Sequence, residues 1–163
     1  MRTKLFHGLA ALGFVGAGFV AGAIGLAVGG PDRWYARLVK PAGNPPGWVF
    51  GPIWSTLYVL QGLSGYRVWR AGAKGALALW GAQLGLNALW TPLFFGAHAP
   101  RAALADLIAL WSTLGAYTVS AWRVSRGAGA LVLPYWAWVS YAGYLNAQIT
   151  RLNPPQRKLA SVL

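Results

Sequence analysis

The sequence predicts an all-α integral membrane protein: a single domain, residues 1–163, folded as a bundle of five transmembrane helices. Hydrophobic residues make up 56% of the chain and charged residues 10%, whereas a typical soluble domain is about 25% charged. Five apolar runs can each span the hydrocarbon core of a bilayer, which takes about 20 residues per helix. Short connections, such as 98–101 and 123–126, make consecutive helices antiparallel neighbours.

The first helix is expected over residues 5–29, where Gly29-Gly30-Pro31 terminates it. It contains Ala21-Gly22-Ala23, which resembles a signal-peptide cleavage site. Its apolar run, residues 9–28, is longer than the about 7 to 15 residues of a signal-peptide core. We therefore expect this helix to remain part of the protein.

Four further helices are expected over residues 46–69, 75–97, 101–124 and 127–150. Their apolar runs are 48–66, 75–97, 102–122 and 127–150, and only the third of these contains a charge. Pro45 and Pro46 stiffen the loop that enters the helix over 46–69. Pro52 falls near the start of the same helix, where proline costs few hydrogen bonds.

The chain is strongly basic, because fourteen Lys and Arg residues stand against two acids, Asp32 and Asp106. The charges lie between the apolar runs, so we interpret the basic excess as contact with lipid headgroups and expect no nucleic-acid binding. The side of the N-terminus carries Arg2, Lys4, Arg67, Arg70, Lys74, Arg123 and Arg126, and the opposite side carries Arg33, Arg37, Lys40, Arg101, Arg151, Arg157 and Lys158. This seven-to-seven balance gives no orientation under the positive-inside rule. We expect a multi-pass protein of a bacterial cell membrane.

The predicted interior offers little acid–base chemistry. Asp106 is the only acid within a span, and with Arg101 nearby in the same helix we expect it near the membrane interface in a structural role. A proton relay is the alternative for this residue. His7 and His98 are expected to contact headgroups or water at helix ends. Because the chain has no cysteine and Met1 is its only thioether, we expect neither a disulfide nor a bound metal.

Aromatic and amide side chains recur on shared faces of three predicted helices. The helix over 46–69 carries Phe50, Trp54, Tyr58 and Gln61 at spacings of four, four and three. The helix over 75–97 carries Trp80, Gln83, Asn87 and Trp90, and the helix over 127–150 carries Trp138, Tyr141, Ala142, Leu145 and Gln148, with Asn146 close by.

These stripes have two interpretations. Large rings with a few polar groups are the usual lining of a small-molecule pocket, so we expect the three stripes to meet around one cavity. The alternative is that Gln83, Asn87 and Asn146 only join helices through hydrogen bonds, as amides often do in membranes.

Several ordered segments resemble a known family. They are residues 31–41 (PDRWYARLVKP), 40–54 (KPAGNPPGWVFGPIW), 83–96 (QLGLNALWTPLFFG), 134–138 (PYWAW) and the pair Leu145-Asn146. Together they cover nearly the whole chain, and they resemble the TspO/translocator-protein family, also called peripheral-type benzodiazepine receptors.

The resemblance implies a five-helix bundle that binds porphyrins such as protoporphyrin IX, sterols and benzodiazepine-site drugs in a pocket covered by the first loop. The implied ligand-binding residues, together with the amide Gln83 from the stripe, are Trp48, Phe50, Trp54, Tyr58, Gln83, Asn87, Trp138, Ala142 and Leu145. Arg33, Arg37 and Lys40 are candidates to neutralise propionates at the rim. No cofactor is required; the tetrapyrrole is a ligand.

Glycines in small-xxx-small spacing predict close helix contacts. Gly18, Gly22, Gly25 and Gly29 are expected to pack the first helix within one subunit. Family dimers are thought to use the third helix, so Gly81 and Gly85 are the expected interface of a homodimer.

The chain departs from the family pattern in two places. Ala42-Gly43 replaces the bulkier residues that family members usually carry, so a looser lid is expected. The vertebrate cholesterol motif is incomplete, since Ala147 occupies the place of its tyrosine while Arg151 matches its basic residue and Tyr144 lies too far away. We therefore do not expect cholesterol binding.

Three functions are consistent with these features. The first is a tetrapyrrole-binding receptor or regulator with a role in porphyrin handling and the stress response. The second is an enzyme that degrades porphyrin oxidatively in light, in which Trp54 and Trp138 would be the redox participants. The third is a transporter of tetrapyrroles or sterols, which the lack of an internal repeat and of buried charges disfavours.

Overall fold

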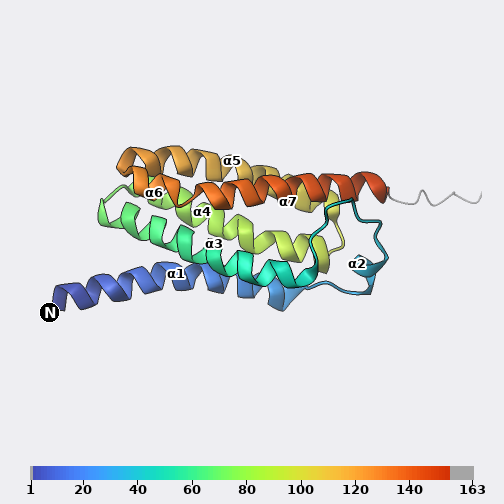
Figure 1. Ribbon diagram of the computed structural model, residues 1–163, viewed down its shortest axis with the longest axis horizontal. Helices are drawn as coiled ribbons and strands as arrows, with labels where there is room; N and C mark the ends of the chain where they lie inside the picture. Colours follow the sequence, from blue (N-terminus) through green and yellow to red (C-terminus); the bar gives the residue numbers. More distant parts are fainter. Residues whose placement is uncertain (1, 155–163) are drawn as a thin grey trace, which may run out of the picture.

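A computed structural model describes residues 2–154, and that part of the chain is helical, with no strand and with one long connection, between α1 and α3 (Figure 1). The elements are α1 (Arg2–Val28), α2 (Arg33–Arg37), α3 (Gly47–Arg70), α4 (Lys74–Thr91), the π-helix η1 (Pro92–Gly96), α5 (Pro100–Val124), α6 (Arg126–Ala130) and α7 (Leu133–Leu152). The predicted all-α class is confirmed. The C-terminal cations Arg157 and Lys158 lie outside the described residues.

Prolines shape the later helices. The helix expected over 127–150 is divided, because a turn at Leu131 and Val132 separates α6 from α7. Pro134 stands in the first turn of α7, where its missing N–H is harmless, whereas within a continuous helix its ring would clash with the preceding turn. Pro92 is likewise the first residue of η1, which directly follows α4.

The long helices lie roughly side by side, with α1 along one edge and α5 and α7 along the opposite edge (Figure 1). α1 packs against α3 and α4, α4 packs against α5, and α5 packs against α7, whereas α3 and α7 touch only sparsely. The long loop that contains α2 lies at the end of the bundle where α7 finishes, opposite the end where α1 begins. These contacts leave the facing sides of α3 and α7 available to form a site.

Glycine allows α1 and α3 to approach closely. A Cβ at Gly62 of α3 would lie 2.6 Å from the Cα of Val15 in α1. A Cβ at Gly18 would lie 2.5 Å from the amide nitrogen of Gln61, and one at Gly22 would collide with the hydroxyl of Tyr58. As the sequence predicts, these glycines of the first helix pack within the subunit.

Polar side chains join the helices inside the bundle. The hydroxyl of Ser64 in α3 lies 2.8 Å from the hydroxyl of Tyr117 in α5 and donates to the carbonyl of Ala128 in α6 over 2.8 Å. Gln83 Nε2 in α4 donates to Gln61 Oε1 in α3 over 2.8 Å. Both glutamines are buried, so a broken pair would leave amide groups without partners in the core.

The outer surface is apolar along much of its length. Two helical segments, Thr3–Val28 and Pro100–Val124, are long and apolar enough on their own to cross a membrane. Large apolar side chains of α1, including Leu5, Leu9 and Leu12, are exposed. Exposed leucines along a helix of this kind are typical of a surface that faces lipid.

The glycine contact generates a stability prediction. Gly62→Ala forces its new methyl group into the α1 backbone, and we expect it to destabilise the fold by about 1–3 kcal/mol, the usual cost of overpacking. Gly51→Ala in the same helix has open space for its methyl group and is the matched control. Thermal unfolding in detergent, followed by circular dichroism, should show a lower midpoint for Gly62→Ala only. Equal midpoints for the two variants would contradict the tight α1–α3 contact.

Candidate functional site

A groove of about 530 Å³ runs between α3 and α7. Pro52, Ile53, Thr56 and Leu57 of α3 form one wall, and Pro134, Ala137, Trp138 and Tyr141 of α7 form the other. The lining is largely apolar and aromatic, with hydroxyl groups at Thr56 and Tyr141. Its size and lining fall in the range of small-molecule sites.

Aromatic side chains of the two helices form a cluster that shares Trp138 with this groove. Trp54 stacks on Tyr58, with ring centroids 5.4 Å apart, and Phe50 meets Trp138 edge to face at 5.9 Å. Tyr135 completes the cluster by packing edge to face on Trp54 at 5.9 Å. The structure therefore brings together Phe50, Trp54 and Tyr58 from one predicted stripe and Trp138 from another.

The third predicted stripe contributes one amide to this cluster. The Tyr58 hydroxyl donates to Asn87 Oδ1 of α4 over 3.3 Å, so Asn87 contacts the ring cluster from the α4 side. Leu145 is buried and Ala142 is half-buried on α7. Ala142 packs at the edge of the same core as Trp54 and Trp138.

Two predicted site residues lie elsewhere. Trp48 is 76% exposed in the first turn of α3, on the outer surface of the helix. Gln83 is fully buried and bonds to Gln61, whose amide nitrogen faces Gly18 of α1. For Gln83 the structure favours the role of joining helices over that of lining a cavity.

Asp106 is buried inside the bundle. The residue is only 7% exposed, and neither carboxylate oxygen has a hydrogen-bond partner among residues 2–154. Within that part of the chain, Arg101 makes no salt bridge to it; the one salt bridge found there joins His98 and Asp32. Five residues along a helix correspond to about 140° around its axis, so Arg101 and Asp106 do not share a face.

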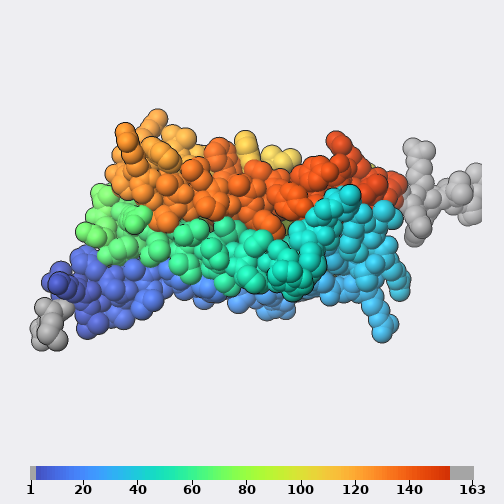
Figure 2. All heavy atoms as spheres, in the orientation of Figure 1, coloured from blue at the N-terminus to red at the C-terminus, as the bar shows by residue number. Residues whose placement is uncertain are grey.

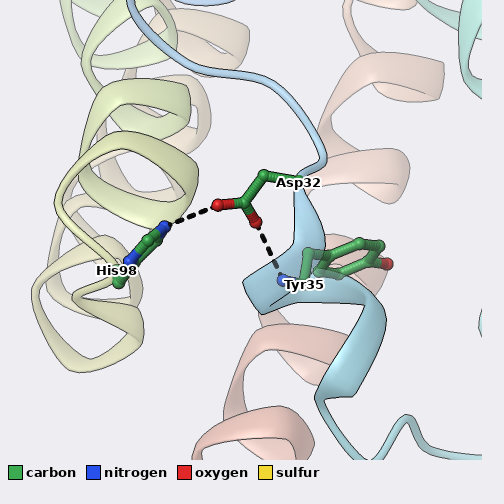
Figure 3. Close-up of polar contacts among 3 residues, drawn as sticks. All are labelled: Asp32, Tyr35 and His98. Atoms are coloured by element: carbon green, nitrogen blue, oxygen red, sulfur yellow. Dashed lines mark hydrogen bonds and ion pairs between the residues drawn. The ribbon is translucent and has the colours of Figure 1, made fainter.

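A charged contact fastens the first loop to the bundle (Figure 3). Asp32 Oδ1 accepts from the backbone N–H of Tyr35 over 2.9 Å and so caps α2, while Asp32 Oδ2 lies 2.9 Å from His98 Nε2. Trp34 stacks on the His98 ring with centroids 4.4 Å apart. His98 is 41% exposed, and besides any contact with water it holds the loop through Asp32 and Trp34, which the sequence did not indicate.

Two further contacts hold the loop against α7. Asn153 exchanges two hydrogen bonds with the backbone of Val39, each 2.9 Å long, and the Tyr141 hydroxyl donates to the carbonyl of Gly43 over 2.5 Å. Because Tyr141 also lines the groove, the loop reaches the rim of the groove. Figure 2 shows the loop surface meeting the C-terminal part of α7.

The three rim cations differ in their surroundings. Lys40 Nζ donates to the carbonyls of Tyr35 at 2.7 Å, Leu38 at 3.3 Å and Ala36 at 3.4 Å. It also lies over the Tyr35 ring, 4.5 Å from the centroid. Lys40 thus stabilises the loop, whereas Arg33 and Arg37 are exposed on α2.

Sequence reasoning missed the contributions of Tyr135 and Asn153. Tyr135 lies three residues before Trp138 and therefore on the same helix face, a spacing that would have revealed it. Asn153 contacts a residue more than a hundred positions away, and no local pattern indicates such a contact. Within residues 2–154 no group of three His, Cys, Asp or Glu side chains could hold a metal ion.

Comparisons with known proteins agree with the sequence resemblance. The model of the TspO/MBR family matches residues 10–152. Protein CrtK of Rhodobacter capsulatus is 40% identical over 144 residues, which cover 85% of this chain and 89% of that protein. The human translocator protein is 42% identical over 146 residues, covering 86% and 82%. The tryptophan-rich sensory protein of Cereibacter sphaeroides is 42% identical over 124 residues, covering 76% and 78%.

The α2 cap generates a pH prediction. The Tyr35 backbone N–H, and to a lesser degree His98, hold the pKa of Asp32 below its ordinary value of 3.8. Since the folded pKa is lowered, ionised Asp32 stabilises the loop above pH 3.8, and this stabilisation is lost as the pH falls through the lower, folded pKa. The NMR shift of the Tyr35 amide proton should titrate with a midpoint below 3.8. Asp32→Asn should abolish this titration, and a midpoint at or above 3.8 would contradict the cap.

Proposed function

The chain belongs to the TspO/MBR family, and from this premise we propose that it is a membrane-embedded receptor or regulator that binds a flat tetrapyrrole such as protoporphyrin IX. The observation that carries the proposal is the aromatic groove between α3 and α7. A tetrapyrrole is a large apolar ring, and Trp138 and Tyr141 supply aromatic surface in that groove. Trp54 and Tyr58 stack on each other in the aromatic cluster of α3 and α7, which includes Trp138. Porphyrin handling and the stress response are the processes that such a receptor would serve.

The first loop supports this proposal as the cover of the site. Its contact with Tyr141 brings Gly43 to the rim of the groove. Arg33 and Arg37, exposed on α2 of the same loop, would be the cations available for the propionates of a porphyrin. Lys40 takes a smaller part in this role, because its ammonium is held by three loop carbonyls. Arginine is also the better partner for a carboxylate, since it can donate two parallel hydrogen bonds.

Members of the TspO family are membrane proteins, and we place this chain in the membrane of a bacterial cell with five crossings. The five crossings would be α1, α3, α4 together with η1, α5, and α6 together with α7. α1 and α5 are sufficiently apolar by themselves. The other helices carry polar groups that are buried against neighbours, such as Ser64, Gln83 and Asn146, which lowers the cost of placing them in lipid.

A second candidate function is the light-driven oxidative degradation of porphyrin. Trp54 and Trp138 favour it, since both indoles are half-buried in the aromatic cluster, Trp138 lines the groove, and indole is an easily oxidised ring. Transport of tetrapyrroles or sterols is a weaker third candidate. Relatives from cattle and humans are named translocator protein, but no internal repeat supports alternating access here.

Ligand binding can be tested with tryptophan variants. Protoporphyrin IX should quench tryptophan fluorescence with roughly micromolar affinity, about 8 kcal/mol. Trp54→Phe and Trp138→Phe keep an aromatic face and should lose about 1 kcal/mol or less, whereas Trp54→Ala and Trp138→Ala should weaken binding about tenfold or more. Trp69→Phe, which lies in a separate aromatic cluster with Phe14 and Tyr66, is the control.

The same variants separate a receptor from an enzyme. If the protein only binds, porphyrin should bleach in light at the rate of the free pigment. If it is an enzyme, a defined product should form with the wild type and disappear with Trp54→Phe or Trp138→Phe while binding persists. Wild-type affinity in Trp54→Ala and Trp138→Ala would show that the groove is not the porphyrin site.

We also propose a homodimer through α4. Gly81 and Gly85 are exposed, and no other part of the described chain lies within 4 Å of a Cβ built on either of them. Gly81→Leu or Gly85→Leu should lower the dimer fraction in detergent, because close backbone approach needs small residues, and should leave porphyrin binding intact. Gly75→Leu, exposed on a different side of α4, is the control. Unchanged dimer fractions by light scattering would place the interface elsewhere.

A further inference from the structure

A second groove lies on the outer side of the bundle, between α5 and α7. It encloses about 390 Å³ and shares no lining residue with the groove between α3 and α7. Its walls include Leu104, Ile108 and Trp111 of α5 and Val139, Ser140 and Gly143 of α7. Ile108 is 60% exposed and Trp111 is 44% exposed, so the groove opens outward. In a chain that crosses the membrane, this side of the bundle faces lipid.

The inside of this groove is apolar. Trp111 Nε1 donates to the Ser140 hydroxyl over 2.8 Å, and that hydroxyl donates to the carbonyl of Trp136 over 2.9 Å. These bonds use the side-chain donors of Trp111 and Ser140, while the rest of the lining is aliphatic or glycine. Gly143 keeps the groove hollow, since no other part of the described chain lies within 4 Å of a Cβ built on it. The groove therefore offers apolar surface to whatever occupies it.

The groove runs from the middle of α5 towards the end of the bundle where the first loop lies. The hydrogen bond between Trp111 and Ser140 joins the two helices at its inner end. Near the start of α5, Asn146 Nδ2 donates to the carbonyl of Pro100 over 2.7 Å. From Arg101 to Trp111 the helix rises about 15 Å, which is half of the about 30 Å hydrocarbon core of a bilayer. The groove thus matches the depth of one lipid leaflet.

Two exposed arginines lie at this end of the groove. Arg101 precedes Ile108 by seven residues, and Arg151 follows Ser140 by eleven. With 3.6 residues per turn, each arginine lies only about 20° around its helix axis from that groove residue. Arg101 and Arg151 therefore continue the two walls of the groove towards the membrane surface.

The chain supplies no acid for these two arginines. Its two acids are Asp32, which bonds to His98, and Asp106, which is buried. Within residues 2–154 the one salt bridge is that between His98 and Asp32. Guanidinium groups bind phosphate with two parallel hydrogen bonds, and they do so more specifically than lysine. The apolar groove and its arginines are complementary to a molecule with a long apolar tail and an anionic head.

We propose that this groove binds one anionic glycerophospholipid from the leaflet at the loop end of the bundle. An acyl chain would lie against Leu104, Trp111 and Gly143, and the headgroup phosphate would be held by Arg101 and Arg151. A sterol would fill the apolar part but has no charge for the arginines. The lipid site rests on the membrane crossings of the proposed function and is independent of porphyrin binding.

Photo-crosslinking lipids test the proposal. Phosphatidylglycerol and phosphatidylcholine with the same diazirine-labelled acyl chain are each added as a minor component to phosphatidylcholine nanodiscs that hold the protein. After illumination, the adducts are mapped by mass spectrometry of peptides. We expect adducts to concentrate in segments 104–111 and 139–143. Phosphatidylglycerol should give about fivefold more adduct there than phosphatidylcholine, because arginines near the membrane surface attract anionic lipid.

Matched variants separate the two parts of the site. Arg101→Gln combined with Arg151→Gln should equalise the two lipids, whereas Arg123→Gln, exposed near the opposite end of α5, should keep the preference. Gly143→Leu fills the groove and should lower the adduct yield in both segments for either lipid. Gly13→Leu on α1 also has open space around its Cβ and should leave that yield unchanged.

Several results would overturn the lipid site. They are adducts spread evenly over the exposed apolar surface, equal yields for the two lipids in the wild type, and a preference that survives in the double arginine variant. Adducts on α1 without adducts in the two segments would overturn the lipid site alone. Adducts on no helix would overturn the proposed crossings with it. Protoporphyrin IX quenching is measured on the same samples, and its failure beside a clear lipid preference would overturn porphyrin binding and leave the lipid site standing.

Discussion

The close contact of α3 with α1 determines most of the architecture. The two backbones approach closely at Gly62 of α3 and at Gly18 and Gly22 of α1. None of these three positions has room for a side chain. α3 is therefore held on the α1 and α4 side of the bundle. α7 is held on the opposite side by α5, for example through the 2.8 Å hydrogen bond from Trp111 to Ser140. The groove between α3 and α7 follows from this separation.

The first loop depends on the same arrangement. Its fastening points belong to three regions that the bundle places at one end: His98 before α5, Tyr141 on α7 and Asn153 after α7. None of these contacts is a strong interaction alone, because exposed polar contacts compete with water. Together they set the position of the loop at the end of the bundle and bring Gly43 to the rim of the groove.

Much of the fold could be predicted because long apolar runs and glycine-proline stops mark helices in a membrane composition. The division near Val132 was harder to predict, because the run stays apolar across it and only Pro134 signals a change. Side-chain partners were predicted less well. The stripe Phe50, Trp54, Tyr58 follows from helical spacing, but spacing could not show that Trp48, at the first turn of α3, projects outward.

The partners of buried polar side chains were the hardest feature to predict from the sequence. Gln61 and Gln83 lie on different helices, and only the tertiary packing reveals that they share a hydrogen bond and so join α3 to α4. Asp106 has no such partner in the described chain. A scaffold gains nothing from an unpaired buried carboxylate, since an apolar residue of similar size would cost less. Helical spacing places Asp106 on the buried face of α5 with Leu107 and Leu110, but it could not show that the carboxylate would lie there without a partner among the described residues.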